Sequence, residues 1–323
     1  MITAAFNAME FVLEFNSADR ILILTDDESI NIAGTFKSAC FQKNCEVTQY
    51  IIKTNDRPLK EIPRELSRLL TNKTIVLNIM RAFAEEISFR IKWLFEIEKQ
   101  QDIKCAHMPG ITEDMMTEGP MDIDYREMKS KAEYLIDNLQ NADSINLITE
   151  EGTELNIGIA GRTFLDDISI RPGFMGNFPC GEIYCAPEET KAAGHVIFNA
   201  SIGDIGLLND NLIAEIKNGK IIKFKSSNSN VLKKIKGLTS VDNDARVIGE
   251  LGIGINPGAR ITGNMLEDEK AIGTAHIAFG NNEDFGGKNK SKIHRDFLIN
   301  KPSIEIHFKN GGTKYLMKNG EII

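Results

Sequence analysis

One segment of the sequence sets a carboxylate beside two glycines in a pattern typical of a β-strand. The segment reads Glu250-Leu-Gly-Ile-Gly-Ile-Asn-Pro. Because side chains alternate between the two faces of a strand, the leucine and the isoleucines share one face, and Glu250, Gly252 and Gly254 share the other. The pattern predicts a carboxylate that stands beside open space, while the opposite face packs into a core.

The segment His276-Ile-Ala-Phe-Gly shows the same alternation around an imidazole. Ile277 and Phe279 are expected to face the core, whereas His276 shares the other face with Ala278 and Gly280. An imidazole with two small neighbours has room beside it for a ligand or an ion.

Two more segments complete this set of polar residues. His294 and Asp296 are two positions apart, so on a strand both point to one face, roughly 7 Å apart at ~3.3 Å per residue. Glu182 follows a turn rich in proline and glycine at the start of a β-like run. Glutamate, aspartate and histidine are ligands that zinc, manganese, cobalt and iron accept. Bridging carboxylates hold pairs of such ions ~3.5–4 Å apart, so the residues predict a metal centre.

Taken together, these segments resemble the aminopeptidase T, or thermophilic metalloaminopeptidase, family. The resemblance covers about residues 176–296 in the family's order, and it includes the acidic run Leu266-Glu-Asp-Glu-Lys before the first histidine. It implies a dinuclear metal site with Glu250 as the bridge. The catalytic residues that it implies are Glu182, Glu250 and Glu269. The metal ligands that it implies are Glu182, Glu250, Glu269, His276, His294 and Asp296.

The acidic run offers more than one candidate for the sixth ligand. Glu269 lies seven residues before His276, and its competitors are Glu267, Asp268 and Glu283. Glu283 also stands where the family usually has a tyrosine.

The resemblance implies a metal-dependent aminopeptidase that hydrolyses the N-terminal residue of short peptides with a metal-activated water. Two divalent ions, zinc, cobalt or manganese, are the implied cofactors, and peptides with a free N-terminus are the substrates. The same superfamily contains 2,5-dihydroxypyridine dioxygenases, in which His276, His294 and Asp296 would hold a single ferrous iron. A catalytically inactive metal-binding relative is the third reading. The number of metal ions separates the first two.

The elements that must position these residues differ between the two halves of the chain. Through about residue 140, runs with helical periodicity alternate with β-rich runs such as Arg20-Ile-Leu-Ile-Leu-Thr. This alternation predicts a doubly wound parallel α/β domain over residues 1–140. No glycine-rich phosphate-binding motif follows these strands, so we expect no nucleotide site there.

Residues 141–323 show short β-like runs separated by turn residues, which predict a β-rich α+β domain that carries the metal site. Asn-Gly pairs at 218–219, 310–311 and 319–320 are typical of tight hairpins. The lysine-rich run 217–236 is interleaved with isoleucine and phenylalanine at hairpin spacing, which predicts a solvated sheet face.

The composition of the 323-residue chain is typical of a folded protein of two domains. Its formal net charge of −8 would repel a phosphate backbone, so nucleic acid is not expected as a partner. No apolar stretch approaches the ~20 residues of a membrane helix, and the first residues lack a signal-peptide pattern. The five cysteines fall in no metal-binding spacing. We therefore expect a cytoplasmic protein with reduced cysteines and no membrane partner, and we expect it to be a homodimer.

Overall fold

The computed structural model describes residues 1–323, and the chain divides into two compact units. One unit comprises residues 1–126 and 167–180, and the other comprises residues 127–166 and 181–323. The chain therefore leaves the first unit, returns to it once and leaves it again. The sequence predicts a single boundary near residue 140, because hydrophobic periodicity identifies a helix without showing which unit the helix packs on.

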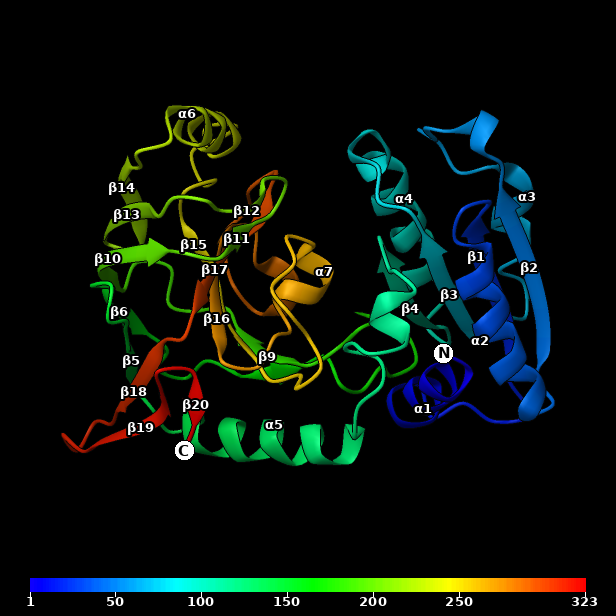
Figure 1. Ribbon diagram of the computed structural model, residues 1–323, viewed down its shortest axis with the longest axis horizontal. Coiled ribbons are helices and arrows are strands. Elements are labelled where there is room, and N and C mark those ends of the chain that lie inside the picture. The colour runs from blue at the N-terminus through cyan, green and yellow to red at the C-terminus, as the bar shows by residue number, and fades with distance from the viewer. The chain divides into compact units, whose positions relative to one another are not determined.

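A five-stranded parallel sheet forms the centre of the first unit, in the order β2-β1-β3-β4-β8. Figure 1 labels β1 to β4 of this sheet. The predicted doubly wound α/β class is confirmed. The central strands are rich in isoleucine, leucine and valine and are buried almost throughout, as expected where helices cover both faces. The strands are β1 (Arg20–Asp26), β2 (Glu46–Ile52), β3 (Ile75–Met80), β4 (Lys104–Pro109) and β8 (Met175–Asn177).

Helices pack on the two faces of this sheet. On one face, Leu66 of α3 and Phe89 and Trp93 of α4 pack with Leu22 and Leu24 of β1. On the other face, α1 packs against α2, and α2 contacts β1 and β2. No helix is both long and apolar enough to cross a membrane. The helices of this unit are α1 (Ile2–Val12), α2 (Ile30–Gln42), α3 (Arg64–Arg68) and α4 (Ile87–Glu98), with short turns η1 (Thr54–Asp56), η2 (Ala84–Glu86) and η3 (Asp114–Met116).

Two antiparallel sheets stack in the second unit, which confirms the predicted β-rich architecture (Figure 1). Phe198 of the eight-stranded sheet packs against Phe279 and Phe297 of the seven-stranded sheet, with ring centroids 6.4 and 4.9 Å away. The core of this unit therefore lies between the sheets.

The eight-stranded sheet has the order β14-β13-β10-β6-β5-β18-β19-β20. Its strands are β5 (Ser144–Ile148), β6 (Glu154–Gly158), β10 (Ala192–Phe198), β13 (Leu212–Lys217), β14 (Lys220–Lys225), β18 (Ser303–His307), β19 (Thr313–Lys318) and β20 (Glu321–Ile322). The seven-stranded sheet has the order β12-β11-β17-β16-β15-β9-β7. Its strands are β7 (Leu165–Asp166), β9 (Glu182–Cys185), β11 (Ser201–Ile202), β12 (Gly206–Leu207), β15 (Ile248–Gly254), β16 (Thr274–Gly280) and β17 (His294–Asn300). The remaining elements are α5 (Tyr125–Leu139), α6 (Ser229–Leu238), α7 (Met265–Asp268) and η4 (Glu283–Phe285).

The predicted Asn-Gly hairpins are confirmed. Asn218 and Gly219 link β13 to β14 with φ of 50° and 72°, and Asn319 and Gly320 link β19 to β20 with φ of 47° and 83°. A positive φ at both central positions is what a type I′ turn requires. The third pair lies in the longer turn between β18 and β19.

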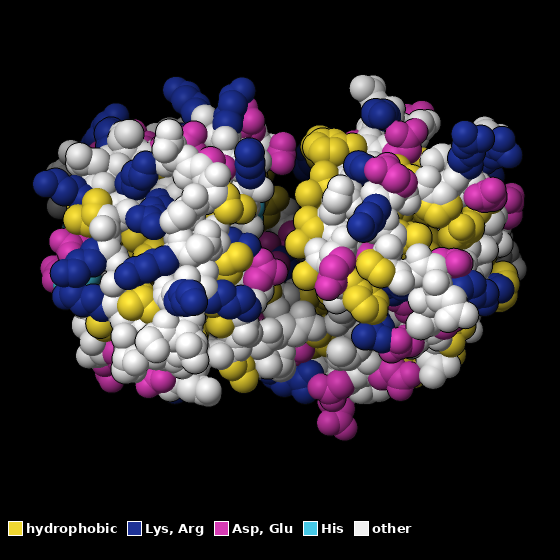
Figure 2. Space-filling model, turned by 90° about the horizontal axis from the view of Figure 1, so that it is seen from above, with side chains coloured by type: hydrophobic (Ala, Val, Ile, Leu, Met, Phe, Trp, Pro, Cys, Tyr) yellow, Lys and Arg dark blue, Asp and Glu magenta, His cyan; other side chains and the backbone are white.

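The lysine-rich run 217–236 is a sheet face only in its first part. On β14 exposed lysines alternate with buried Ile221 and Phe224. Beyond this strand the prediction was wrong, because Asn228 accepts from two backbone N–H groups and starts helix α6. Many lysine and arginine side chains cover this unit on the face seen from above (Figure 2).

Candidate metal centre

Four neighbouring strands, β9, β15, β16 and β17, bring five of the six candidate ligands onto one face of the seven-stranded sheet. The other face carries Leu251, Ile253, Ile277 and Phe279, all fully buried, so the predicted alternation is confirmed. Each of these five candidate ligands stands opposite a small residue on the next strand. The pairs are Glu182 with Gly254, His276 with Gly252, Glu250 with Ala278, Asp296 with Ala278, and His294 with Gly280.

Gly252 leaves the space that the His276 ring occupies. A Cβ on Gly252 would lie 2.0 Å from Nε2 of His276, far inside van der Waals contact. The absence of a side chain on β15 is therefore what lets this imidazole lie flat across the sheet toward the carboxylates.

The substitution Gly252→Ala is expected to displace His276 and to weaken metal binding at least about tenfold, as disturbed ligand orientation does. Overpacking should also lower the free energy of unfolding by about 1–3 kcal/mol. Isothermal titration with zinc and urea unfolding measure the two effects. The matched control is Gly237→Ala in α6, where an added Cβ meets nothing within 4 Å. Wild-type zinc affinity in Gly252→Ala would contradict the assignment of this space to His276.

Glu250 lies between the two imidazoles. Its Oε1 is 3.1 Å from Nε2 of His276, and its Oε2 is 3.3 Å from Nε2 of His294. Nε2 of His276 also lies 3.3 Å from Oε2 of Glu182, and Nε2 of His294 lies 3.4 Å from Oδ1 of Asp296. The contacts define two overlapping groups, Glu182–Glu250–His276 and Glu250–His294–Asp296. Within each group the ligand atoms lie within 4.8 Å of one another. Glu250 belongs to both groups.

The cluster is buried at one end and open at the other. Glu182, Glu250 and His276 are buried, whereas the His294 side chain is 32 % exposed and Asp296 is half-buried. A substrate can therefore approach the cluster from the His294 side.

The electrostatics of the cluster favour positive charge between the carboxylates. Burial raises the pKa of Glu250, but the contacts with His276 and His294 outweigh it and hold this pKa well below its ordinary range. Burial lowers the pKa of His276, but Glu250 and Glu182 raise it to about 9. Carboxylate oxygens and imidazole nitrogens that converge in this way fit a divalent ion of the zinc, manganese, cobalt or iron type.

Glu269 lies at the edge of the cluster rather than within either group of ligand atoms. The buried ammonium of Lys270 contacts the carboxylate of Glu182 and lies 2.8 Å from Oε1 of Glu269. Burial raises the pKa of Glu269, and the charge of nearby Asp296 raises it further against the opposing effect of Lys270. The structure therefore brings five of the six candidate residues together and connects the sixth to them through a lysine.

The three competitors of Glu269 have other partners. Glu267 accepts from the backbone N–H and from Nε of Arg260, at 3.0 and 2.9 Å. Asp268 accepts hydrogen bonds from the backbone N–H groups of residues 262 and 263, and these bonds stabilise the loop before α7. Glu283 is exposed and pairs with Lys290 at 2.9 Å. Among these four acids, Glu269 has the carboxylate that is linked to the ligand cluster.

Sequence reasoning missed two neighbours of the cluster. Lys270 is 1 % exposed, and nothing in an acidic run signals that its lysine will be buried. Tyr184 lies opposite Gly252 on the ligand face, and its ring packs edge-to-face against Phe285, which in turn lies 5.9 Å from the His294 ring. The alternation that identified Glu182 also places Tyr184, two residues later, on the same face.

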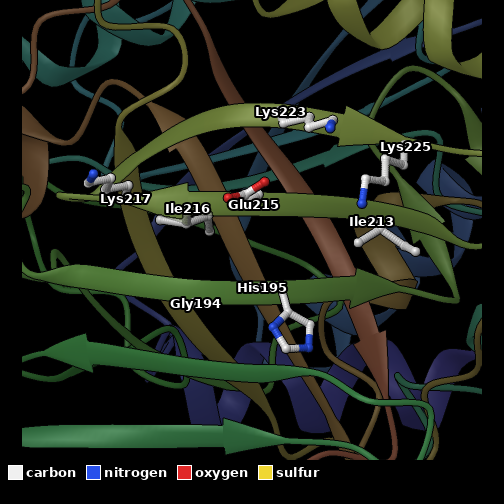
Figure 3. A pocket seen from close by; sticks show the side chains of 8 residues that line it. All are labelled: Gly194, His195, Ile213, Glu215, Ile216, Lys217, Lys223 and Lys225. Carbon is white, nitrogen blue, oxygen red and sulfur yellow. The ribbon is translucent and has the colours of Figure 1, made fainter.

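A cavity of about 600 Å³ lies away from these residues, on the eight-stranded sheet (Figure 3). Side chains of β10, β13 and β14 line it, including His195, Glu215 and Lys225, and none of the candidate ligands does. These side chains lie on the polar face of the sheet, opposite its buried isoleucines and phenylalanines.

Comparison with known protein families identifies the family of this chain. The family described as thermophilic metalloprotease (M29) matches residues 116–322 of the chain. The chain belongs to this family. The match confirms the resemblance found in the sequence, and it includes every candidate residue of the site. Membership of a metalloprotease family implies a divalent metal, for which the two groups of carboxylate and imidazole atoms are the available ligands.

One curated relative in sequence is aminopeptidase PepS of Streptococcus thermophilus. It is 24 % identical over 199 residues, which are 54 % of this chain and 47 % of the relative. The chain therefore spans about half the length of the curated relative that it matches.

Two solved structures share the fold of this thermophilic metalloprotease family member over its full length. The 2,5-dihydroxypyridine dioxygenase of Pseudomonas putida has a TM-score of 0.76, and wild-type AmpT of Thermus thermophilus has a TM-score of 0.74. Each is 15 % identical, and each alignment covers 100 % of this chain and 98 % of the other. At this identity the two structures establish the fold alone.

Proposed function

We propose that the protein is a metal-dependent aminopeptidase that removes the N-terminal residue of short peptides. The observation that carries the proposal is the position of Glu250, shared by two groups of ligand atoms on one open sheet face. A carboxylate with two oxygens in two such groups can bridge a pair of divalent ions, which lie ~3.5–4 Å apart in two-metal sites. The proposed ligands of two zinc, cobalt or manganese ions are Glu182, Glu250, Glu269, His276, His294 and Asp296. Membership of the metalloprotease family supports this reading.

Two divalent ions in such a centre would lower the pKa of a bound water toward neutrality and polarise the scissile carbonyl. The chain's own residues orient the ligands and handle the proton. The Lys270 ammonium contacts both Glu182 and Glu269, so it links these two carboxylates and offsets part of their charge. Glu269, at the edge of the cluster beside Lys270, would take a proton from the bound water and pass it to the leaving amine.

The proposal includes a substrate with a free α-amine, a cytoplasmic location and a homodimer. Nucleic acid and membranes are not part of it. The net charge of −8 supports the exclusion of nucleic acid, because a phosphate backbone would be repelled.

Wild-type protein loaded with cobalt, manganese or zinc is expected to release the first residue of unblocked di- and tripeptides. Chelation should abolish the activity and renewed metal should restore it, because the ions activate the water. The same peptides with an acetylated N-terminus serve as the control and should remain intact. The readout is the appearance of free amino acid, with metal content measured on the same sample. Intact unblocked peptides at full occupancy of two ions would contradict the proposal.

A second candidate function is ring cleavage by a single ferrous iron. It is favoured by the presence of His276, His294 and Asp296 on one face and by the shared fold of the dioxygenase structure. This function predicts one bound iron per chain, oxygen uptake with a dihydroxylated pyridine and no cleavage of peptides. These results would show that the protein is a dioxygenase and not a peptidase. An anomalous-scattering map that counts the ions and identifies the element separates the two functions. Full metal occupancy with neither activity would indicate a metal-binding relative without catalysis.

A further inference from the structure

A cavity in the first unit lies at the carboxyl ends of β1 and β3. These strands are neighbours, and the strand order reverses between them, because the chain continues from β1 to the outer strand β2 and then crosses back to β3. In doubly wound sheets this crevice is where ligands bind. The cavity has a volume of about 290 Å³. Its lining includes Glu28, Thr54, Arg57, Pro58, Arg81 and Phe83.

Asp26 and Arg57 line the floor of this cavity, and together with Glu86 they form a buried group of three charged side chains. The guanidinium of Arg57, 5 % exposed, contacts the carboxylates of Asp26 and Glu86, which are 2 % and 0 % exposed. Nε of Arg57 donates to Oε1 of Glu86 at 2.9 Å. One guanidinium between two carboxylates leaves one negative charge in excess, so the floor favours a cationic group above it.

The rim of the cavity carries one charge of each sign and an aromatic ring. Arg81 and Glu28 contact each other and are 46 % and 51 % exposed. An exposed pair of this kind is weak and exchanges readily for contacts with a ligand. The Phe83 ring lies 4.2 Å from the guanidinium carbon of Arg57 and 4.7 Å from that of Arg81, measured to the ring centroid. The rim thus offers a cation, an anion and an apolar wall together.

We propose that this cavity binds a free α-amino acid with an apolar side chain. The α-carboxylate pairs with the planar guanidinium of Arg81, a geometry that suits bidentate contact. The α-ammonium pairs with Glu28 above the negative floor, and the side chain packs on Phe83 and Pro58. A zwitterion satisfies both rim charges without adding net charge, whereas a phosphate meets the excess negative charge below. The volume is near the lower limit of small-molecule sites, ~300 Å³, which suits a single amino acid.

This inference goes beyond the proposed function and does not depend on it. Every residue of the cavity belongs to the first unit, whereas the candidate ligands belong to the second. Leucine that bound at the metal centre as a reaction product would need Glu250, and leucine in this cavity would not.

The test is calorimetric titration of L-leucine into the full-length Glu250→Gln variant after chelation, which silences the metal centre. We expect binding to persist there and to weaken at least about tenfold on adding Arg81→Gln or Glu28→Gln, since each removes one charge-assisted contact. N-acetyl-leucine and leucinamide, each lacking one ligand charge, should bind as weakly as leucine does to those variants. The matched controls are Lys92→Gln and Glu61→Gln, an exposed ion pair in the same unit, which should leave the affinity unchanged.

Three results would overturn the proposal. One is the absence of leucine binding to the wild-type protein, and another is binding that Arg81→Gln and Glu28→Gln leave unchanged. The third is binding that disappears with Glu250→Gln alone, because the leucine would then have been at the metal centre. Both rim residues are exposed, so neither variant should unfold the unit, and the fluorescence of the buried Trp93 checks this.

Discussion

Glu250→Gln is expected to abolish hydrolysis, with a loss of at least about 100-fold, while the protein stays folded. The amide keeps the volume of the carboxylate but removes the charge that both groups of ligand atoms share. Loss of a ligand's hydrogen-bonding partner alone costs about 10–100-fold in metal affinity, and loss of a shared ligand should cost more. Peptide hydrolysis and metal content, both measured after incubation with zinc, test the expectation.

Glu283→Gln is the matched control for this experiment. Glu283 is an exposed glutamate that pairs with Lys290 and stands outside the ligand cluster. Its neutralisation should leave both metal content and hydrolysis close to the wild-type level, whereas Glu250→Gln should change both. Two bound ions and full activity in Glu250→Gln would show that Glu250 does not bridge the ions.

Arg57→Met is expected to destabilise the first unit by about 3–5 kcal/mol, because it leaves two buried carboxylates without their partner. The fluorescence of Trp93, the single tryptophan, measures this in urea, since its ring lies in the core of the same unit. With two compact units the chain need not unfold in one step, and this probe reports on one unit alone.

Two further variants show whether the loss of stability in Arg57→Met comes from unpaired buried charge or from the lost volume of the side chain. Arg81→Met removes an exposed arginine next to Arg57 and should change stability by no more than ~1 kcal/mol. Arg57→Met combined with Asp26→Asn and Glu86→Gln should recover part of the loss, because no unpaired charge remains buried. Equal stability of Arg57→Met and the wild-type protein would show that the buried charges do not need each other.

The stability of the first unit depends on pH through the carboxyl group of Asp26. Burial raises its pKa, but the backbone N–H groups of Arg81 and Ser29 and the charge of Arg57 outweigh burial and lower it. A carboxyl whose pKa is lower in the folded than in the unfolded state stabilises the fold above its ordinary pKa. That contribution is lost as the pH falls through the lowered value.

The residue types of the site and the face on which each stands could be read from the sequence, because alternation along a strand is a local property. Glu250 and His276 each have small neighbours two positions away, and the hydrophobic residues between them identify the core face. The Asn-Gly hairpins could also be predicted from the sequence, since a type I′ turn depends on the φ preferences of two adjacent residues.

Tertiary structure alone decided which residues meet. Cross-strand register sets Glu182 opposite Gly254 and Asp296 opposite Ala278, although these residues come from distant parts of the chain. Pairing of this kind depends on long-range packing that no local pattern encodes. Which of the neighbouring acids can contact the ligand cluster likewise depends on tertiary structure, because Glu267 and Asp268 accept hydrogen bonds from the loop before α7.

Burial of charge was the other property that the sequence could not show. Lys270 and Arg57 occur in polar runs, where such residues are ordinarily solvated. Both are buried because folding encloses each beside two carboxylates, Glu182 and Glu269 in one case and Asp26 and Glu86 in the other. The sequence by itself therefore determined the ligand types and their strand faces. Only the folded chain decided how they converge and which charges are enclosed, because those depend on contacts between segments far apart in the sequence.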